Sequence, residues 1–394
     1  MLAAICRRRL AVLFPQIPGG CAGAYPLQYN PGISVLLSHS YSSTAVAGGP
    51  CSEPCPDTIS YFITCGLSPD DASTTARNIR IRSTEKADAV CALLRSYGFS
   101  DRDVARMLRS APLLLTVDPD RIIRPKLEFF VSMGFEPRKL ASVPLLLARS
   151  LHNHTIPTMQ FLRGVISSDD EIRRGFYRSP RALTGNLDKN MRPAVEALRK
   201  HGLTNEEISK VLAVHMSVLM QSPRRIGEIF EDLEAAGMSI KDKRFANCFR
   251  VMCSMRRETW HRKVALYRSF GLSEDVVFEA FKKQPTALLV ADETIKKKVS
   301  FFLDVLKLEI SAVIAHPVIL ASSMEKNIMP RCAVLSVLMR EGKIEPDIKL
   351  LQSLTGSAKI FSNKFVLKYA EDVPDVVKAY EGKIKFEGFK GRDV

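Results

Sequence analysis

No run of apolar residues in this chain approaches the roughly 18 to 20 that a bilayer-spanning helix needs, although hydrophobic residues make up 46% of its composition. A transmembrane protein is therefore not expected. The sequence also lacks the Gly-rich phosphate loop of nucleotide-binding proteins, the G-x-G-x-x-G fingerprint of dinucleotide-binding folds and the G-x-S-x-G turn of serine hydrolases. Because none of these occurs in 394 residues, we expect a protein that is not an enzyme and needs no cofactor and no small-molecule substrate.

Cysteine pairs with metal-ligand spacing are missing as well. There is no C-x-x-C pair and no nearby His-x3-His to complete a tetrahedral zinc site. Cys51 and Cys55 are close in sequence, but no second pair accompanies them. We therefore expect free thiols and no metal. The nine cysteines stand at positions 6, 21, 51, 55, 65, 91, 248, 253 and 332.

Three further features could suggest chemistry but have simpler structural interpretations. The acidic residues 169–171 could bind magnesium, but acids at such a place are more typical of a helix start. His152 and His154 lie two residues apart, which is a poor metal spacing on a helix, so we expect a polar surface there. Trp260 could stack on a base, but as the only Trp it stands among helical apolar positions and is expected in the core.

Acidic residues are absent from Met1 to Ser52. Three arginines at positions 7–9 stand beside the apolar stretch 10–14, and a Ser-rich segment follows at 38–43. This composition is typical of organellar transit peptides. We predict a transit peptide and linker over residues 1–50, with the mitochondrion as the favoured destination and the chloroplast as the alternative.

A Gly, an apolar residue and a Ser or Thr recur along the rest of the chain, with spacings of 32, 36, 35 and 34 residues between neighbouring copies. Gly ends a helix cheaply in the left-handed conformation, and Ser or Thr caps the amides of the next helix. Thr204 and Glu207 even form a capping-box pattern. The copies are Gly66-Leu67-Ser68, Gly98-Phe99-Ser100, the partial Gly134-Phe135-Glu136, Gly202-Leu203-Thr204, Gly237-Met238-Ser239 and Gly271-Leu272-Ser273.

A proline in phase with the glycines predicts the end of the first helix of each repeat, because Pro lacks an amide and crowds the preceding turn. Met216 takes this place in one repeat, and the copy near Phe249 is degenerate. Apolar turns that should be buried follow at 113–115, 145–147 and 288–290. The landmark prolines are Pro112, Pro144, Pro180, Pro285 and Pro317.

Six residues after each landmark, five of six positions hold a residue that caps helices well, which predicts the start of a second helix. These positions are Asp118, Ser150, Asn186, Ser222, Ala291 and Ser323. Pro125, Pro157, Pro193 and Pro330 fall about two turns further on. Either the second helix kinks there, or the capped turn is a separate 3₁₀ piece and the main helix begins near the Pro, which is the version we favour.

A single hairpin of this kind cannot bury its apolar face alone, so neighbours must stack into a continuous core. We therefore predict an all-α fold, a superhelical solenoid of about eight helix-turn-helix repeats of 32–36 residues, which excludes a compact α/β enzyme. The repeat domain is expected over residues 58–385, followed by a basic C-terminal tail at 386–394. The protein is expected to be a monomer.

The repeat period, the Gly-apolar-Ser start, the Pro followed by leucines and the segment Pro-Lys-Leu-Glu-Phe-Phe at 125–130 resemble the mitochondrial transcription termination factor (mTERF) family, especially its plant branch. The resemblance covers about residues 58–385, including the closing segments 365–369 and 373–380. It implies a left-handed solenoid whose basic concave path follows double-stranded DNA, and a role in organellar transcription, its termination or intron splicing. The chain departs from the pattern near 236–260, where the landmark Pro is missing.

The 57 Lys and Arg outnumber the 42 Asp and Glu by 15, so a polyanion is the first candidate partner. Nine residues after the landmark the chain is basic in four of six repeats, and three residues further on in three. This phase lies near the start of the second helix, where the helix dipole disfavours a cation by up to about 1 kcal/mol. Backbone amides with Lys or Arg make a phosphate site, and stacked repeats would join such sites into a track.

The densest stretch, residues 241–298, carries 14 basic and 7 acidic residues. A solvated outer face with snorkelling cations is the simpler alternative. The residues predicted to bind nucleic acid are Arg121, Arg124, Lys126, Lys189, Arg192, Arg224, Arg225, Arg256, Arg257, Arg262, Lys263, Lys296, Lys297, Lys298, Lys326 and Arg331.

The sequence thus predicts an organellar protein that binds double-stranded DNA and regulates transcription or its termination. Structured intron RNA is the near alternative, since both polymers offer the same phosphates. A protein-binding scaffold is a second alternative, because helical repeats commonly bind peptides. A membrane surface is a remote third.

Overall fold

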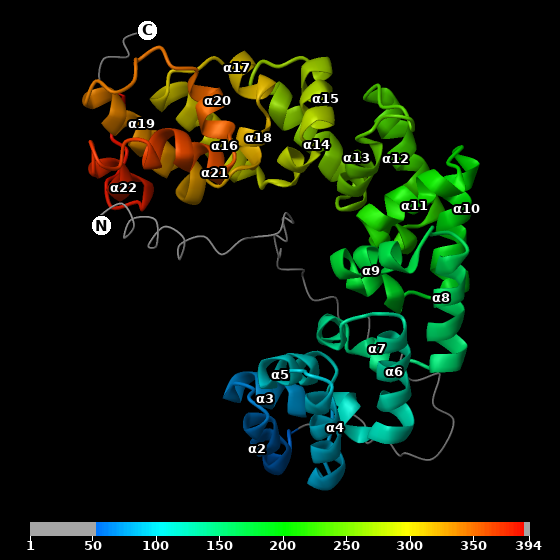
Figure 1. The fold of residues 1–394 in the computed structure, drawn as a ribbon. Coiled ribbons are helices and arrows are strands. Elements are labelled where there is room, and N and C mark those ends of the chain that lie inside the picture. Colours follow the sequence, from blue (N-terminus) through cyan, green and yellow to red (C-terminus); the bar gives the residue numbers. More distant parts are fainter. Residues whose placement is uncertain (1–52, 390–394) are drawn as a thin grey trace.

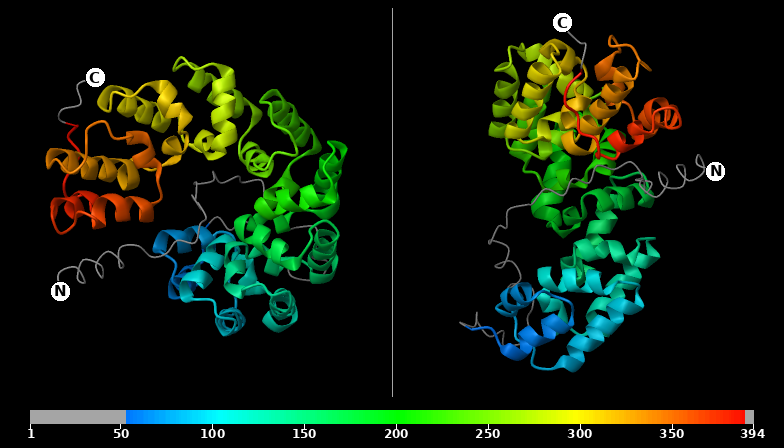
Figure 2. Two further views of the ribbon diagram at one scale, coloured as in Figure 1. Left: turned by 45° about the horizontal axis from the view of Figure 1, so that its top comes forward. Right: turned by 90° about the vertical axis from the view of Figure 1, so that its left-hand side faces the viewer.

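The computed structural model describes residues 53–389, and this part of the chain contains helices and no strands (Figure 1). The predicted transit peptide lies outside the described residues. The helices follow one another in sequence order along a curved path, and the N-terminal and C-terminal repeats face each other across the opening of the arc (Figure 2). None of the described helices is long and apolar enough to span a membrane. The predicted all-α solenoid is confirmed.

Most repeats contain a first helix, a short middle helix and a second helix, whereas the repeats at 69–96 and 245–268 lack the middle helix. The first helices are α3 (Pro69–Ala76), α5 (Asp101–Ser110), η4 (Pro137–Ser142), α9 (Asp169–Arg178), α11 (Asn205–Val214), α13 (Phe245–Cys253), α15 (Glu274–Lys283) and α17 (Ile310–Ala315). The middle helices are η2 (Pro112–Thr116), α7 (Leu145–Ala148), η6 (Pro180–Thr184), η8 (Met216–Met220), η9 (Pro285–Leu289), α18 (Val318–Ala321) and α20 (Leu350–Thr355).

The second helix ends each repeat. The second helices are α2 (Pro56–Thr64), α4 (Thr84–Ser96), α6 (Arg124–Ser132), α8 (Ile156–Arg163), α10 (Arg192–Lys200), α12 (Pro223–Ala235), α14 (Arg257–Arg268), α16 (Asp292–Ser300) and α19 (Met329–Arg340). The array closes with α21 (Ala358–Phe361), the wide turn η12 (Ser362–Leu367) and α22 (Asp375–Tyr380), which packs on α19.

The repeated glycines take the predicted left-handed conformation, with φ between 66° and 91° at positions 66, 98, 134, 202, 237 and 271. Ser68, Ser100, Thr204 and Ser273 cap the helices that follow, and the capping box of Thr204 with Glu207 is confirmed. Acidic residues 169–171 occupy the first turn of α9, as expected.

The partial copy at Glu136 gives no side-chain cap, and one full copy of the glycine motif does not start a helix. The carboxylate of Asp242 accepts the amide of Ser239 at 2.6 Å, which closes a local turn, and α13 begins only at Phe245 without a side-chain cap. The prediction of a helix start at Ser239 was therefore wrong, because this local hydrogen bond competes with the helix.

The prolines inside the second helices produce a wide turn rather than a 3₁₀ piece. In four repeats the residue before the Pro donates its amide to the carbonyl five residues back, in η3 (Pro119–Ile123), η5 (Leu151–Thr155), η7 (Leu187–Met191) and η11 (Met324–Ile328). The α-helix then begins at that residue, close to the Pro as predicted. The wider turn makes room for a ring that has no amide to donate. Where no Pro stands seven residues after the cap, as in α12 with Ile229, the helix runs directly from the cap.

Aromatic contacts join the core from one repeat to the next. Phe135 contacts Phe130 and Phe176 edge-on, with ring centroids 5.3 Å apart in both pairs. Trp260 is 2% exposed and packs against Phe281, which confirms the expected core position. In the first apolar turn two leucines are buried as predicted, but Leu113 is 42% exposed.

The C-terminal boundary differs from the prediction. Phe386 packs on Phe301, with ring centroids 6.2 Å apart, and the carbonyl of Gly388 accepts the hydroxyl of Ser336 at 2.9 Å. Lys390 and Arg392 are balanced by two acids in the same segment. Residues 386–389 therefore pack on the array, and the rest of the predicted tail, 390–394, lies outside the described residues.

Candidate nucleic-acid interface

The capped turns hold a cation at the same place in three repeats. The side chains of Asp118, Asn186 and Ser323 accept the amide three residues further on, at 2.9, 2.8 and 3.1 Å. That third residue is Arg121, Lys189 or Lys326, and all three side chains are exposed. We call these three residues the cap-turn cations. They form no ion pair within the described part of the chain, so their charge faces solvent.

Caps at the two remaining predicted positions are also confirmed, at Ser150 and Ser222. The cation after Ser222 behaves differently, however. The guanidinium of Arg225 is directed at the carbonyls of Met252 and Met255, at 3.1 and 3.0 Å, and its side chain is only 14% exposed. Arg225 therefore does not belong to the cap-turn cations.

A second set of exposed cations follows one turn later. Arg124 pairs with Asp120 at 2.6 Å and Arg192 with Asp188 at 3.0 Å, so the same pair recurs in two repeats. Exposed pairs of this kind contribute little to stability, so a phosphate can replace the carboxylate. Lys297 is exposed in the corresponding place.

The other predicted residues of the basic stretch divide between solvent and internal pairs. Arg224, Arg256, Arg262 and Lys296 are exposed, and all but Arg256 pair with a neighbouring carboxylate. Arg257 forms ion pairs with both Glu231 and Asp232, at 2.9 and 3.0 Å. Because Asp232 is 4% exposed, Arg257 serves a buried carboxylate, and this corrects its assignment to the interface.

Four residues predicted to bind nucleic acid have buried side chains, which cannot contact a phosphate on the protein surface. Lys126, Lys263, Lys298 and Arg331 are 3% to 5% exposed. Lys126 donates to the carbonyl of Leu147 at 2.6 Å, and Arg331 donates to those of Leu354 and Gly356 at 2.5 and 2.6 Å. The prediction was wrong for these residues because it counted charge without burial.

A further row of cations was missed by the sequence analysis. Arg106, Arg138, Arg174 and Lys210 stand six residues before the landmark in four successive repeats, and all are exposed. Arg106 and Arg138 share the carboxylate of Asp103, at 2.8 and 3.5 Å. The recurrent phase on the first helix was the signal that could have found them.

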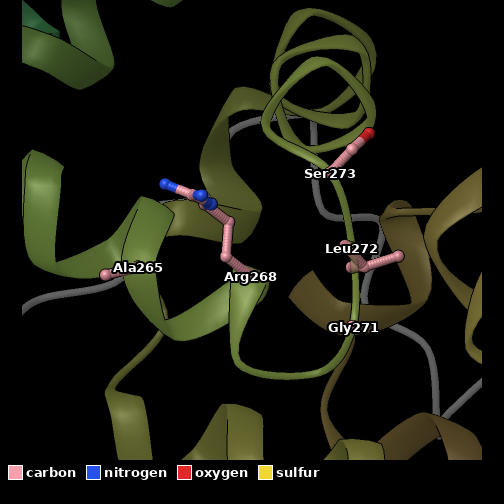
Figure 3. A pocket seen from close by; sticks show the side chains of 5 residues that line it. All are labelled: Ala265, Arg268, Gly271, Leu272 and Ser273. Atoms are coloured by element: carbon pink, nitrogen blue, oxygen red, sulfur yellow. The ribbon is translucent and has the colours of Figure 1, made fainter.

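A shallow hollow lies between α14 and α15 (Figure 3). Arg268, the last residue of α14, is its single charged lining residue and pairs with Glu274 at 3.2 Å. The hollow therefore belongs to a repeat junction, at the opposite end of the second helix from the capped turns.

The histidine pair has no metal-binding geometry. Nε2 of His154 lies 2.9 Å from the carbonyl oxygen of Gly185, and burial lowers the pKa of His154, while His152 is exposed. Within residues 53–389, His, Cys, Asp and Glu side chains form no group of three that could hold a metal ion.

Comparison with known proteins identifies two curated relatives from Arabidopsis thaliana. The mitochondrial transcription termination factor MTERF15 is 25% identical over 291 residues, which is 73% of this chain and 57% of that protein. The chloroplastic transcription termination factor MTERF8 is 20% identical over 287 residues, or 71% of this chain and 55% of that protein. The chain thus spans little more than half the length of the curated relatives it matches.

A family model described as mTERF matches residues 54–164, 91–292 and 158–362. These overlapping matches follow the repeat array from its first helix to its closing turn, as the glycine, proline and cap spacing indicated. The chain therefore belongs to the mTERF family.

Proposed function

We propose that this chain binds double-stranded DNA of an organelle along its capped turns and regulates transcription or its termination. The carrying observation is the recurrence of the cap-turn cations Arg121, Lys189 and Lys326 at one position of one local structure. A cation there is disfavoured by the helix dipole, so folding gives no reason for it. Binding to a row of phosphates would explain a cation at this position, because stacked repeats present the same position along the array.

The family and its relatives support the biological setting. Two relatives carry names that make them transcription termination factors, one mitochondrial and one chloroplastic. We propose the mitochondrion as the location and the chloroplast as the alternative, and a binding protein rather than an enzyme. Import of the full chain into isolated mitochondria and chloroplasts tests the location, since entry into chloroplasts alone would contradict it.

The test of DNA binding neutralises Arg121, Lys189, Arg192 and Lys326 to Gln in one variant. Binding to duplex DNA is measured against salt concentration. The plot of log K against log salt has a negative slope, and each lost phosphate contact reduces the magnitude of that slope by about 0.9. We expect a smaller slope and at least about a tenfold lower affinity, with unchanged helical content by circular dichroism. An unchanged slope would contradict the proposal.

A matched control exists at the other end of the second helices. Arg95, Arg163 and Arg268 pair across the glycine turn with the acid six residues on, at 2.8, 2.7 and 3.2 Å, and Arg199 bonds Asn205 in the same way. Changing these four residues to Gln removes equal charge from a different surface, so DNA binding should change much less. Competition with structured RNA completes the test: preferential binding of RNA would make the chain an RNA-binding protein, and no binding of either polymer would favour the protein scaffold.

A further inference from the structure

Buried cations connect successive repeats of this array. Each belongs to a second helix, and each donates to main-chain carbonyls at the end of the next middle helix or of α13. We call Lys126, Arg225, Lys263, Lys298 and Arg331 the bridging cations. Their acceptors are Leu147 for Lys126, Met252 and Met255 for Arg225, Val290 for Lys263, Leu320 and Ser322 for Lys298, and Leu354 and Gly356 for Arg331.

The acceptors are groups that need a donor. The last carbonyls of a helix have no partner within the helix, and they carry the negative end of its dipole. Lys298 supplies two of them with hydrogen bonds of 2.7 and 2.5 Å while it is only 3% exposed. A buried charge is tolerated only when its hydrogen bonds are satisfied, so this contact has a definite geometry.

Four of the bridging cations keep one register even though the second helices begin in two ways, whereas Arg225 lies only three residues after its cap Ser222. Lys298 lies seven residues after the cap position of Ala291, where the helix starts directly. Lys126 and Arg331 lie eight residues after Asp118 and Ser323, where a wide turn precedes the helix. The wide turn contains one extra residue per turn, and the longer spacing returns the cation to the same face.

The register of the acceptors links these bonds to the surface. Ser322, which accepts from Lys298, immediately precedes the cap residue Ser323, and Ser323 holds the amide of Lys326. Met255 and Val290 likewise precede the cap positions of α14 and α16. A bridging cation thus fixes where the next capped turn stands relative to its own helix.

We infer that the bridging cations are positioning residues for nucleic-acid binding, which hold the turn at the start of the next second helix in place while remaining out of contact with the polymer, and that Lys298 in this way positions the cap-turn cation Lys326. This inference rests on the proposed function. Lys298 is the sharpest case, because its bond to Ser322 ends one residue before the cap that presents Lys326.

A double-mutant cycle on the full chain tests the inference. Lys326→Gln is made in the native protein and in Lys298→Met, and binding to one duplex DNA is measured across a salt series. In the native protein Lys326→Gln should lower the salt slope by about 0.9, the value of one phosphate contact. In the Lys298→Met background it should lower the slope by much less, because Lys326 no longer stands at the spacing of the phosphates.

Two controls separate positioning from simple loss of stability. Val299, the neighbour of Lys298, is 3% exposed. Val299→Ala truncates this buried side chain without touching the bridging contact, so Lys326→Gln should reduce the salt dependence in this background as much as in the native protein. Lys298→Arg should also preserve it, since Arg331 makes the same contact in the next repeat. Lys298→Gln, which removes the charge and keeps a donor, replaces Lys298→Met if that variant does not fold.

The outcomes distinguish the positioning role of Lys298 from the proposed DNA-binding function. An equal effect of Lys326→Gln in both backgrounds would overturn the positioning role and leave the proposed function standing. No effect of Lys326→Gln in the native protein would overturn the cap-turn track and the positioning role together. A reduced effect confined to the Lys298→Met or Lys298→Gln background supports the inference.

Discussion

The hydroxyl oxygen of Ser179 and Nδ1 of His215 lie 2.6 Å apart and share a hydrogen bond between successive repeats. The two residues are equivalent, because each immediately precedes a middle helix, η6 or η8. Burial lowers the pKa of His215 to about 4, and the nearby guanidinium groups of Arg250 and Arg178 act in the same direction. The imidazole is therefore neutral at physiological pH.

This pair predicts a loss of stability in mild acid. The pKa of His215 lies below its ordinary value of 6.5, so the unfolded chain binds the proton more readily between pH 6.5 and 4. The stabilisation is complete above pH 6.5 and is lost as the pH falls toward 4, by at most about 3 kcal/mol. Urea unfolding of the native protein and of His215→Asn, compared at pH 7 and pH 4.5, measures it. A constant difference between the two proteins would contradict the assignment.

Lys126 predicts a dependence of the same origin in an alkaline range. Burial lowers its pKa to about 8, below the ordinary 10.5 of the unfolded chain, so the unfolded state binds more protons between pH 8 and 10.5 and stability rises with pH there. Relative to Lys126→Met, the native protein should gain up to about 3 kcal/mol across this window. Below pH 8 the difference between the two proteins should be flat, and a slope confined to that lower range would show that another group titrates.

Local chemistry explains what the sequence predicted well. A cap such as Ser323 and its amide partner Lys326 lie three residues apart, so the sequence spacing alone predicts the hydrogen bond. The glycine turns and the capping box of Thr204 are equally local. The predicted solenoid followed from these signals, because their period alone sets the repeat.

The burial of cations could not be predicted in the same way. By its sequence position beside Pro125, Lys126 is expected on the surface, but the carbonyl that accepts its hydrogen bond belongs to Leu147 in the next repeat. Only the three-dimensional stacking of repeats brings the two together. For the same reason Arg257 was assigned to the interface, although its carboxylate partner Asp232 lies 25 residues earlier.

The thiol of Cys65 should be the most reactive of the buried cysteines in the array. A hydrogen bond from Cys91 lowers the pKa of Cys65 below its ordinary value, whereas burial raises the pKa of Cys248 and Cys253 to about 12. Because the thiolate is the nucleophile, alkylation of Cys65 by iodoacetamide should begin at a lower pH than alkylation of Cys248 or Cys253. Peptide mass spectrometry of the folded protein follows each site.

The control for this prediction removes the donor. Cys91→Ala should shift the alkylation profile of Cys65 to higher pH, since the thiolate loses its hydrogen bond. Labelling of Cys248 or Cys253 at the rate of Cys65 would indicate opening of the array rather than a lowered pKa.

Two helical glycines should respond to the same substitution with opposite signs. A Cβ on Gly175 in α9 would lie 2.9 Å from the carbonyl oxygen of Leu212 and 2.9 Å from Cε of Met216. The methionine tail can move, but the carbonyl belongs to the backbone of α11, so the two helices must separate. Overpacking of this kind costs about 1 to 3 kcal/mol, which exceeds the gain of up to about 1 kcal/mol in helix propensity. Gly175→Ala should therefore destabilise the protein.

Gly227 in α12 is the matched position. A Cβ there meets only Nε2 of His201, at 3.6 Å, which is ordinary van der Waals contact. Gly227→Ala should stabilise the protein by about 0.5 to 1 kcal/mol, because Ala favours the helix and restricts the unfolded chain. Urea midpoints of the two variants give the signs directly. A stabilising Gly175→Ala would mean that α9 and α11 pack less tightly than the 2.9 Å contact implies, because only then could the propensity gain outweigh the clash.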